Sequence, residues 1–441
     1  MIADRDRCEV AIIGAGPAGI SCAYVLAKAG MDAIVLERGR YPGAKNMFGG
    51  IFYSNQMNKL FPNFHKEAPV ERYVSKKRYS MLVDNSEIAF NFEPEEFKKP
   101  PYNSSFIVKR SVFDGWFARK AEAEGACIIN NVNIKDFLWD KDKIAGVISG
   151  AGSDNALLAD VVICAEGANS LLTQKAGLRN KLSMRARTVA LKEVIKMPRE
   201  VIEERFNLTG DEGAAYEYYG DAVSGMLGTG FIYTNKDSIS VGVGVLISEM
   251  YRHKNNISSN ELLEKFKNHP CIYPLIKGGE LLEYSAHMIP TDGYRNIPKL
   301  YTDNLLVVGD AAGLLNNSFF HEGVNMAMAS GVLAAETILR NRDGNKSCYD
   351  AKSLSYYKKL LEGCFVLDDM KNCRDFLDIL HTHKELINDY PHALKSALVK
   401  YFEVSDTPKR VTKKETFSQL MKEISVRRVS HAFMSMMKGG I

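Results

Sequence analysis

Apolar and small residues alternate in a simple order at the start of the chain. Residues 10–13 form an apolar run that predicts a buried strand, and residues 33–36 form a second run of the same kind. Between them lies a stretch rich in glycine and alanine, which predicts a helix that packs closely on its neighbours. Strand, helix and strand in this order predict a βα unit of the dinucleotide-binding type.

The turn after the first predicted strand has the spacing of a phosphate-binding loop. Gly14, Gly16 and Gly19 fit G-x-G-x-x-G, which allows a tight turn, a close approach of pyrophosphate and close packing of the helix. Glu37 follows Gly14 by 23 positions, at the end of the second strand, where a carboxylate can accept both ribose hydroxyls. The Glu37 carboxylate argues against a cofactor with a 2′-phosphate, but this stretch does not distinguish NAD from FAD.

The pattern continues with elements of the same kind. Residues 111–124 predict a helix, and residues 161–165 predict another buried strand. This strand ends on Glu166 and Gly167 and leads into a helix that begins at about Ser170.

An inserted sheet then interrupts this fold. Residues 184–246 carry alternating, aromatic and glycine-broken runs that predict strands. The earlier pattern returns in residues 304–339, where a strand leads to Gly309, an irregular loop follows, and a long helix begins near Gly323. The fold class is therefore α/β: a Rossmann-like nucleotide-binding domain interrupted by an antiparallel-sheet substrate domain, with a helical C-terminal region.

These patterns divide the chain into three parts. The expected parts are residues 1–75, 102–180 and 286–342 for the nucleotide domain, residues 76–101 and 181–285 for the inserted sheet, and residues 343–441 for the helical region with a basic tail.

Composition narrows the chemistry. The chain has 441 residues and a formal net charge of +4, and its eight cysteines form no C-x-x-C pair, which disfavours a local iron–sulfur, zinc or other metal site. Charged residues precede the first apolar run, which argues against a secretory signal. No stretch approaches the roughly 18 apolar residues of a membrane span. We therefore expect a cytoplasmic protein whose contact with a bilayer, if it has one, is peripheral.

The positive charge is concentrated at the end of the chain. From Pro408 onward, eight basic residues face two acidic ones, and apolar residues recur at helical spacing from Phe417 to Ile424. This pattern predicts an amphipathic helix that meets an anionic membrane surface, an acidic partner or its own domain. Nucleic acid is disfavoured because no aromatic residues interleave with the basic ones as they do in nucleic-acid-binding motifs.

Three motifs in this order resemble a known flavoprotein fold. The glycine fingerprint, AEGANS and VVGDAAG follow one another as in the FAD-binding domain of flavoproteins similar to p-hydroxybenzoate hydroxylase. A narrower resemblance covers almost the whole chain. GAKNMFGGIFY, GTGFIYTNKDSISVGVGV and GGELLEYSAHMIP resemble the FixC flavoprotein subunits, relatives of electron-transfer-flavoprotein:quinone oxidoreductase.

This resemblance implies an FAD-dependent electron-transfer oxidoreductase. Its partners would be the electron-transfer flavoprotein subunits as donor, a small ferredoxin-like iron–sulfur protein and a quinone, at the inner face of the cell membrane. Asp310 would bind the ribityl region, and the helix after Gly323 would point its positive end at the flavin. The full set of residues expected to bind FAD is Gly14, Gly16, Pro17, Ala18, Gly19, Glu37, Arg38, Lys45, Gly49, Gly50, Arg110, Glu166, Gly167, Gly309, Asp310, Gly323, Val324 and Asn325.

Two positions depart from the relatives. Glu166 stands where an aspartate is usual, and Thr229 stands where the quinone oxidoreductases have glycine, next to Gly228, the candidate for the quinone side. No certain catalytic acid or base is expected, because electron transfer requires none.

The sequence is also compatible with other functions. A geranylgeranyl reductase shares the scaffold, although this chain lacks the aromatic-proline segment of those enzymes. A hydroxylase is a weaker alternative. A flavin-free binding protein of the same fold is disfavoured by the intact glycines and by Glu37.

Overall fold

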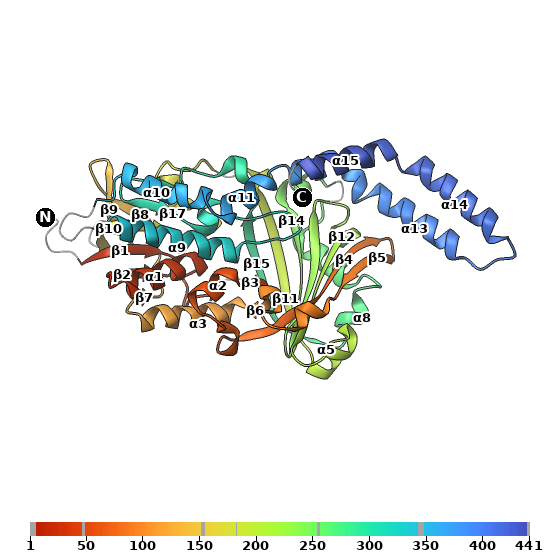
Figure 1. The fold of residues 1–441 in the computed structure, drawn as a ribbon, viewed down its shortest axis with the longest axis horizontal. Coiled ribbons are helices and arrows are strands. Elements are labelled where there is room, and N and C mark those ends of the chain that lie inside the picture. Colours follow the sequence, from red (N-terminus) through yellow and green to blue (C-terminus); the bar gives the residue numbers. More distant parts are fainter. Residues whose placement is uncertain are drawn as a thin grey trace. The chain divides into compact units, whose positions relative to one another are not determined.

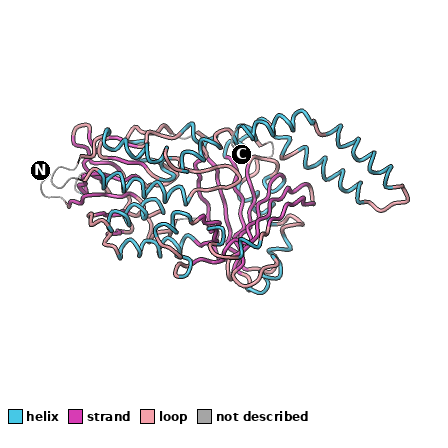
Figure 2. The backbone as a smooth tube through the Cα atoms, viewed as in Figure 1, coloured by secondary structure: helices cyan, strands magenta, loops and turns pink. Residues whose placement is uncertain are grey.

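A computed structural model describes residues 6–45, 49–150, 155–181, 183–253, 256–342 and 348–438 (Figures 1 and 2). The chain forms two compact units, each built from three segments. The first unit comprises Met1–Val70, Ser104–Arg187 and Met288–Lys371, and the second comprises Glu71–Asn103, Thr188–His287 and Asn372–Ile441.

The first unit contains a mainly parallel sheet with buried strands. Its strand order is β16-β17-β10-β1-β2-β7, and β9 adds to β10 and carries β8. The strands are β1 (Arg7–Ile13), β2 (Ala33–Leu36), β7 (Cys127–Ile129), β8 (Asp136–Asp140), β9 (Lys143–Ile148), β10 (Ala156–Cys164), β16 (Tyr301–Thr302) and β17 (Leu305–Val307). The parallel pairs β1–β2, β1–β10 and β10–β17 confirm the predicted βα architecture.

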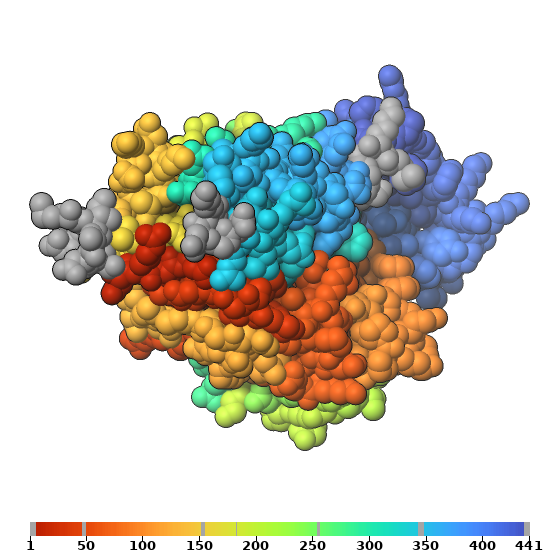
Figure 3. Space-filling model, turned by 60° about the vertical axis from the view of Figure 1, so that its left-hand side comes forward, coloured from red at the N-terminus to blue at the C-terminus, as the bar shows by residue number. Residues whose placement is uncertain are grey.

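Helices pack closely on one another in this unit. Helix α1 (Pro17–Lys28) contacts α9 (Val324–Arg340) and α3 (Arg110–Ala123). A Cβ at Gly331 would lie 2.0 Å from the backbone oxygen of Ala18, so only glycine allows this approach of α1 and α9. In the space-filling view, the N-terminal segment (red) adjoins the α9 and α10 segment (cyan to blue) (Figure 3). The remaining elements are α2 (Asn55–Leu60), α4 (Leu171–Lys175), α10 (Ala351–Glu362), α11 (Phe365–Asn372), and the paired strands β3 (Gly49–Tyr53) and β6 (Ser105–Lys109).

The second unit is built on a larger sheet. Its strands follow the order β15-β11-β14-β13-β12-β4, and β5 pairs with β4. They are β4 (Val70–Val83), β5 (Ser86–Phe92), β11 (Arg187–Lys196), β12 (Glu212–Gly220), β13 (Gly228–Thr234), β14 (Ser238–Leu246) and β15 (Glu280–Pro290). The pairs β11–β14, β13–β14 and β12–β13 are antiparallel, as predicted, but β12 runs parallel to β4.

Apolar residues cover one face of this sheet. Phe206 of α5 (Arg199–Phe206) and Phe266 of α7 (Ser259–Lys267) join strand residues such as Ile232 and Val243 in one buried cluster. Helix α7 begins with a capping box, in which the Ser258 hydroxyl accepts from the Glu261 backbone N–H and the Glu261 carboxylate accepts from that of Ser258. The short helices α6 (Ile247–Arg252) and α8 (Tyr273–Ile276) complete this part.

The chain ends in helices, as predicted. They are α12 (Phe376–Thr382), α13 (Asp389–Phe402), α14 (Lys409–Glu423) and α15 (Val426–Lys438), and α13 packs along α14. The expected separate C-terminal part is divided instead: α10 and α11 belong to the first unit, where Tyr357 and Leu361 are buried, and α12 to α15 belong to the second. The reason is that α10 packs on α9. In the described ranges, no helix is long and apolar enough to cross a bilayer.

Candidate functional site

The glycine turn after β1 is fixed by close backbone contacts. Gly14 has φ +102° and donates its N–H to the Leu36 oxygen at 2.9 Å. A Cβ at Gly14 would lie 2.5 Å from the Ala165 oxygen, and a Cβ at Gly19 would lie 2.0 Å from the Gly14 oxygen. Both glycines are therefore required by packing within the protein, at the carboxyl ends of β1, β2 and β10.

Gly16 differs from its two neighbours because it borders open space. It is the N-cap of α1 and has an extended backbone with φ −81°. Apart from its two chain neighbours, no residue would have an atom within 4 Å of a Cβ added there. No side chain caps this end, and Pro17 occupies the first turn. The N-terminus of α1 thus presents the positive end of a helix to a space that a phosphate can enter.

The Glu37 carboxylate lies beside the same helix end. It accepts the backbone N–H of Ala15 at 2.8 Å and that of Gly39 at 2.6 Å, one on each oxygen. A carboxylate oxygen has a second lone pair, so each can still accept a hydroxyl. Arg38, next in the chain, is exposed, and Lys45 is exposed in a turn.

Arg110 begins α3 and forms a bidentate pair with Asp114. Its Nε and one terminal nitrogen donate to the two carboxylate oxygens at 2.6 and 2.7 Å. Burial opposes the charged form, but Asp114, with a smaller contribution from Asp310, raises the pKa of Arg110. Arg110 and Asp310 are thus electrostatically coupled, although 200 positions separate them in sequence.

Gly309 and Asp310 start a short helical turn after β17. Gly309 has φ +61°, and its N–H donates to the Ser330 hydroxyl of α9 at 2.9 Å. A Cβ on Gly309 would lie 3.0 Å from the Ala18 side chain. This turn therefore packs against the first turn of α1, and the structure brings Ala18, Gly309 and Asp310 into one region.

The N-terminus of α9 is held by its own side chains. Gly323 is the N-cap and Val324 the first helical residue. The Asn325 side chain is buried and engaged at both ends: its oxygen accepts the Gln56 N–H at 2.8 Å, and its nitrogen donates to Glu322 at 2.7 Å. The Asn325 side chain thus ties the start of α9 to α2 and to Glu322.

The Glu166 carboxylate has a structural role that the sequence did not predict. Its carboxylate accepts the backbone N–H groups of Leu172 and Thr173 at 2.9 and 2.7 Å and the Thr173 hydroxyl at 2.9 Å. It therefore caps the N-terminus of α4 from outside the helix, and the glutamate side chain is long enough to reach these N–H groups. Gly167 follows with φ +80°. Gly49 and Gly50, also expected near the cofactor, open β3, where they pair with Lys109 and Val108.

A second missed feature is a buried ion pair. Arg179 donates to the Asp292 carboxylate, to the Ala311 oxygen at 2.8 Å and to the Ser170 hydroxyl at 3.1 Å. Both charged side chains are at most 4% exposed. Arg179 thus ties the residues after Gly309 to the turn before α4, but its partner lies 113 positions away and no local pattern announces it.

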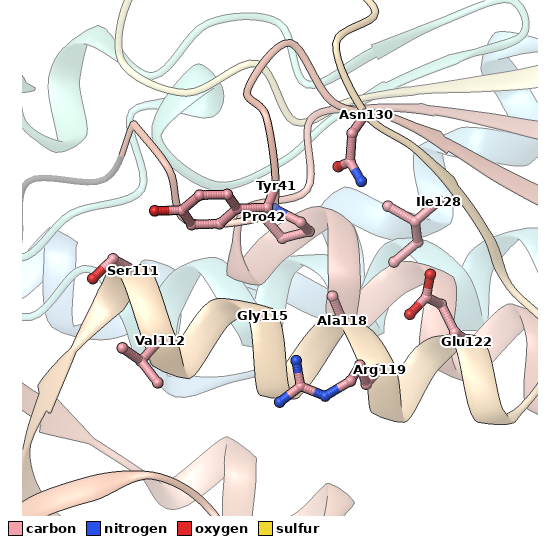
Figure 4. Close-up of a pocket in the computed structure, with 10 residues that line it drawn as sticks. All are labelled: Tyr41, Pro42, Ser111, Val112, Gly115, Ala118, Arg119, Glu122, Ile128 and Asn130. Carbon is pink, nitrogen blue, oxygen red and sulfur yellow. The ribbon is translucent and has the colours of Figure 1, made fainter.

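A pocket of about 420 Å³ lies elsewhere in the first unit (Figure 4). The turn of Tyr41 and Pro42 faces α3, and Ile128 and Asn130 approach from the end of β7. None of the residues expected to bind a dinucleotide lines this pocket. It is therefore not the predicted cofactor site.

Gly228, the candidate for the quinone side, has a packing reason of its own. A Cβ there would lie 2.2 Å from the Gly244 oxygen across the β13–β14 pair. The Thr229 hydroxyl hydrogen-bonds to the backbone oxygens of Tyr218 and Gly230 at 3.2 and 2.9 Å. Both features are explained within the sheet.

Comparison with known proteins identifies the family. The profile of the FAD binding domain matches residues 7–338, and that of the ETF-QO/FixC family C-terminal domain matches residues 376–439. The chain is 41% identical over 422 residues to protein FixC of Bradyrhizobium diazoefficiens, with 95% of each chain covered. It belongs to the FixC family.

Other similarities agree with this family. The FixC-family chain is 37% identical over 410 residues to an Escherichia coli protein, YdiS, named as an electron transfer flavoprotein-quinone oxidoreductase, with 93% and 94% of the two chains covered. A solved structure of a geranylgeranyl bacteriochlorophyll reductase-like protein from Thermoplasma acidophilum has a TM-score of 0.67 at 19% identity, covering 97% and 96% of the chains. At this identity the likeness concerns the fold alone.

The FixC-family chain is an FAD-dependent oxidoreductase, and FAD is its cofactor. The residues at the N-terminus of α1 fit the binding of FAD. The space beside Gly16 is open, the helix end is positive, and Glu37 keeps acceptor capacity on both oxygens.

Proposed function

We propose that this flavoprotein takes electrons from an electron-transfer flavoprotein and passes them, with an iron–sulfur partner, to a quinone. Identity to FixC and to the relative named as an electron transfer flavoprotein-quinone oxidoreductase, over more than 90% of the chain, carries this proposal. The ferredoxin-like partner is inferred from the lack of a clustered cysteine motif in this sequence.

The residues assigned to FAD are those at the ends of β1, β2 and β17. The N-terminus of α1 at Gly16 binds the pyrophosphate, Glu37 accepts the adenosine ribose hydroxyls, and Asp310 binds the ribityl chain. Arg110, held by Asp114, adds positive charge beside Asp310. The N-terminus of α9 favours negative charge on the reduced flavin.

When bound, FAD accepts and releases two electrons. The protein binds the cofactor, orients it and sets its potential through charges and helix ends.

The proposal is tested by mixing the oxidised protein with single donors under anaerobic conditions. We expect reduced electron-transfer flavoprotein to bleach the FAD absorbance rapidly in a stopped-flow instrument. NADH or NADPH alone should reduce it negligibly, because the chain has one dinucleotide fingerprint and FAD occupies it. Fast reduction by NADPH without reduction by the flavoprotein would favour a reductase or hydroxylase instead.

Glu37→Ala should weaken FAD binding without unfolding the chain. The variant loses hydrogen bonds between a carboxylate and hydroxyls, each worth about 1.5–3 kcal/mol, so affinity should fall by about tenfold or more. Titration of apo-protein with FAD measures this change. Glu124→Ala, on an exposed residue at the end of α3, is the matched control. An unchanged dissociation constant for Glu37→Ala would remove this residue from the ribose site.

Peripheral attachment to an anionic membrane surface is assigned to the basic C-terminal helices. Phe417 and Met421 of α14 are 63% and 44% exposed beside basic residues. Deletion from Pro408 should leave FAD bound and abolish co-sedimentation with anionic vesicles, as should high salt. Lys413→Glu with Lys414→Glu should weaken vesicle binding without removing the helix. Unaltered sedimentation of both variants would favour a packed helix with a solvated face.

A further inference from the structure

Helix α15 contacts α12 within the second unit, and little apolar surface is buried along it. Of the α15 side chains that the structure describes, residues 426–435, only that of Ala432 is buried. Val426, Phe433 and Met434 are 54%, 62% and 54% exposed, so these apolar side chains do not hold the helix in place. Polar contacts therefore have a large share in its attachment.

One hydrogen bond between two imidazole rings joins α15 to the end of α12. Nδ1 of His431, on α15, lies 3.2 Å from Nε2 of His383, the residue that follows α12. His383 is only 7% exposed, and its other nitrogen, Nδ1, lies 3.2 Å from the Glu385 carboxylate. Because a carboxylate accepts hydrogen bonds, neutral His383 carries its proton on Nδ1. Its Nε2 is then the acceptor for the Nδ1–H of His431.

The His383 side of this bond is anchored by apolar packing. Ile387, four positions after His383, belongs to a buried cluster with Leu227 and Leu246 of the same unit. Leu380 of α12 packs against this cluster. Loss of the bond between the rings should therefore free α15 and leave α12 in place.

Charged groups flank the two rings. Burial opposes the charge of Glu385, but its own backbone N–H, His383 and Arg428 of α15 together lower the pKa of Glu385. Its carboxylate therefore stays charged over the range in which histidine titrates. Arg428 precedes His431 by three positions, so the two side chains lie on the same side of α15.

The other charges beside α12 pair with one another. Lys384 Nζ donates to the carboxylate of Glu249, on α6, at 2.7 Å. Nε2 of His381 lies 3.6 Å from the same carboxylate, and its Nδ1 lies 3.0 Å from the backbone oxygen of Leu377 in its own helix. Protonation of His381 therefore strengthens the contact of α12 with α6 and does not involve α15.

We propose that the imidazole pair, His383 and His431, is a pH-sensitive contact that releases α15 when both rings are protonated. One added proton preserves the bond, because an imidazolium N–H can donate to the lone pair of the neutral ring. With a second proton, both facing nitrogens carry hydrogen and neither accepts. Two positive rings then face each other, and Arg428 adds a third charge. Glu385 offsets part of this repulsion, but it lies at the far nitrogen of His383.

Low pH favours release because the released state binds one proton more than the attached state. The ratio of released to attached protein should rise by at most about tenfold for each unit of pH, which is the limit for one proton. Histidine changes its charge between about pH 5 and 8, so the change falls in this range. A free helix of 13 residues is marginal in water, so its amides then exchange with solvent.

The test is amide hydrogen exchange of the FAD-loaded protein, followed by mass spectrometry at pH 8 and pH 5. Protection factors, which correct for the intrinsic exchange rate at each pH, are compared for α15. We expect them to fall by about 10- to 100-fold from pH 8 to pH 5. Helix α7, which contains no histidine, should keep its protection and serves as the reference within the same unit.

Two variants separate the imidazole bond from other contacts of α15. The amide of His431→Asn stands where Nδ1 was, and it donates to neutral His383 or accepts from the protonated ring without becoming charged. Protection of α15 should therefore be retained at both pH values. His431→Ala removes the bond and should lower protection at pH 8 to about the wild-type level at pH 5. His381→Asn, which changes a neighbouring histidine that does not contact α15, should keep the wild-type pH dependence.

Three results would contradict the proposal. One is equal protection of wild-type α15 at pH 8 and pH 5. Another is loss of protection at pH 5 in His431→Asn, since the asparagine cannot take up the second proton. The third is full protection at pH 8 in His431→Ala, which would show that other contacts hold the helix. Circular dichroism and the FAD content show in each case that the variant is folded.

Discussion

Gly16→Val should remove FAD binding while leaving the apo-protein as stable as the wild type. The added side chain meets no protein atom near its Cβ, and valine accepts the extended backbone found there. It would instead occupy the space assigned to the pyrophosphate and block access to the N–H groups of α1. We expect affinity to fall by at least about 100-fold, or about 2.7 kcal/mol.

Titration of apo-protein with FAD and thermal unfolding of the apo-protein together test this expectation. The matched control is Gly19→Ala, whose Cβ would lie 2.0 Å from the Gly14 oxygen. This control should lose stability as well as FAD, because the α1 backbone must shift. Tight FAD binding by Gly16→Val would place the pyrophosphate elsewhere.

Arg179→Ala should destabilise the first unit by about 3–5 kcal/mol, because it leaves the Asp292 carboxylate buried without its cation. The backbone oxygen of Ala311 also loses its donor. Chemical denaturation followed by circular dichroism measures the loss. Replacing both members, as Arg179→Met with Asp292→Leu, should recover much of the stability, since no isolated charge then remains.

The loss in Arg179→Ala should depend on pH. Burial raises the pKa of Asp292 even though Arg179 lies beside it, and the pKa should rise further without the arginine. An acid whose pKa is raised on folding stabilises the fold below its unfolded pKa, and that contribution disappears as the pH rises through the folded pKa. The variant should therefore approach wild-type stability as the pH falls below neutral. A loss independent of pH would show that the charge of Asp292 does not change over this range and would contradict the expectation.

Local pattern was sufficient for much of the first unit. The run at 33–36 coincides with β2, and the helices expected at 111–124 and after Gly323 are α3 and α9 within a residue or two. Short apolar runs bounded by glycine have few structural alternatives, so these elements could be read from the chain. The parallel pairing of β12 with β4 could not, because nothing in either strand specifies a partner some 140 positions away.

Some residues of the candidate site could likewise be predicted from the sequence, and others could not. The fingerprint glycines and Glu37 could be assigned because their spacing is itself the signal. Glu166 and Asn325 were also predicted to bind FAD, and the sequence did not reveal that their side chains hold α4 and the start of α9. The Arg179–Asp292 pair depends on a tertiary contact, which no single segment reveals.

The buried cysteine thiols of the first unit resist oxidation. Cys22 and Cys164 are fully buried, and burial raises the pKa of both thiols. Burial, with Asp32 and Asp160 nearby, raises that of Cys8 to about 12. Since the thiolate is the nucleophile that attacks peroxide, these thiols are poor targets for oxidation. A flavoprotein whose reduced cofactor reacts with oxygen can thus release peroxide without oxidation of its buried cysteines. The exposed thiols of Cys127 and Cys348 should be oxidised first.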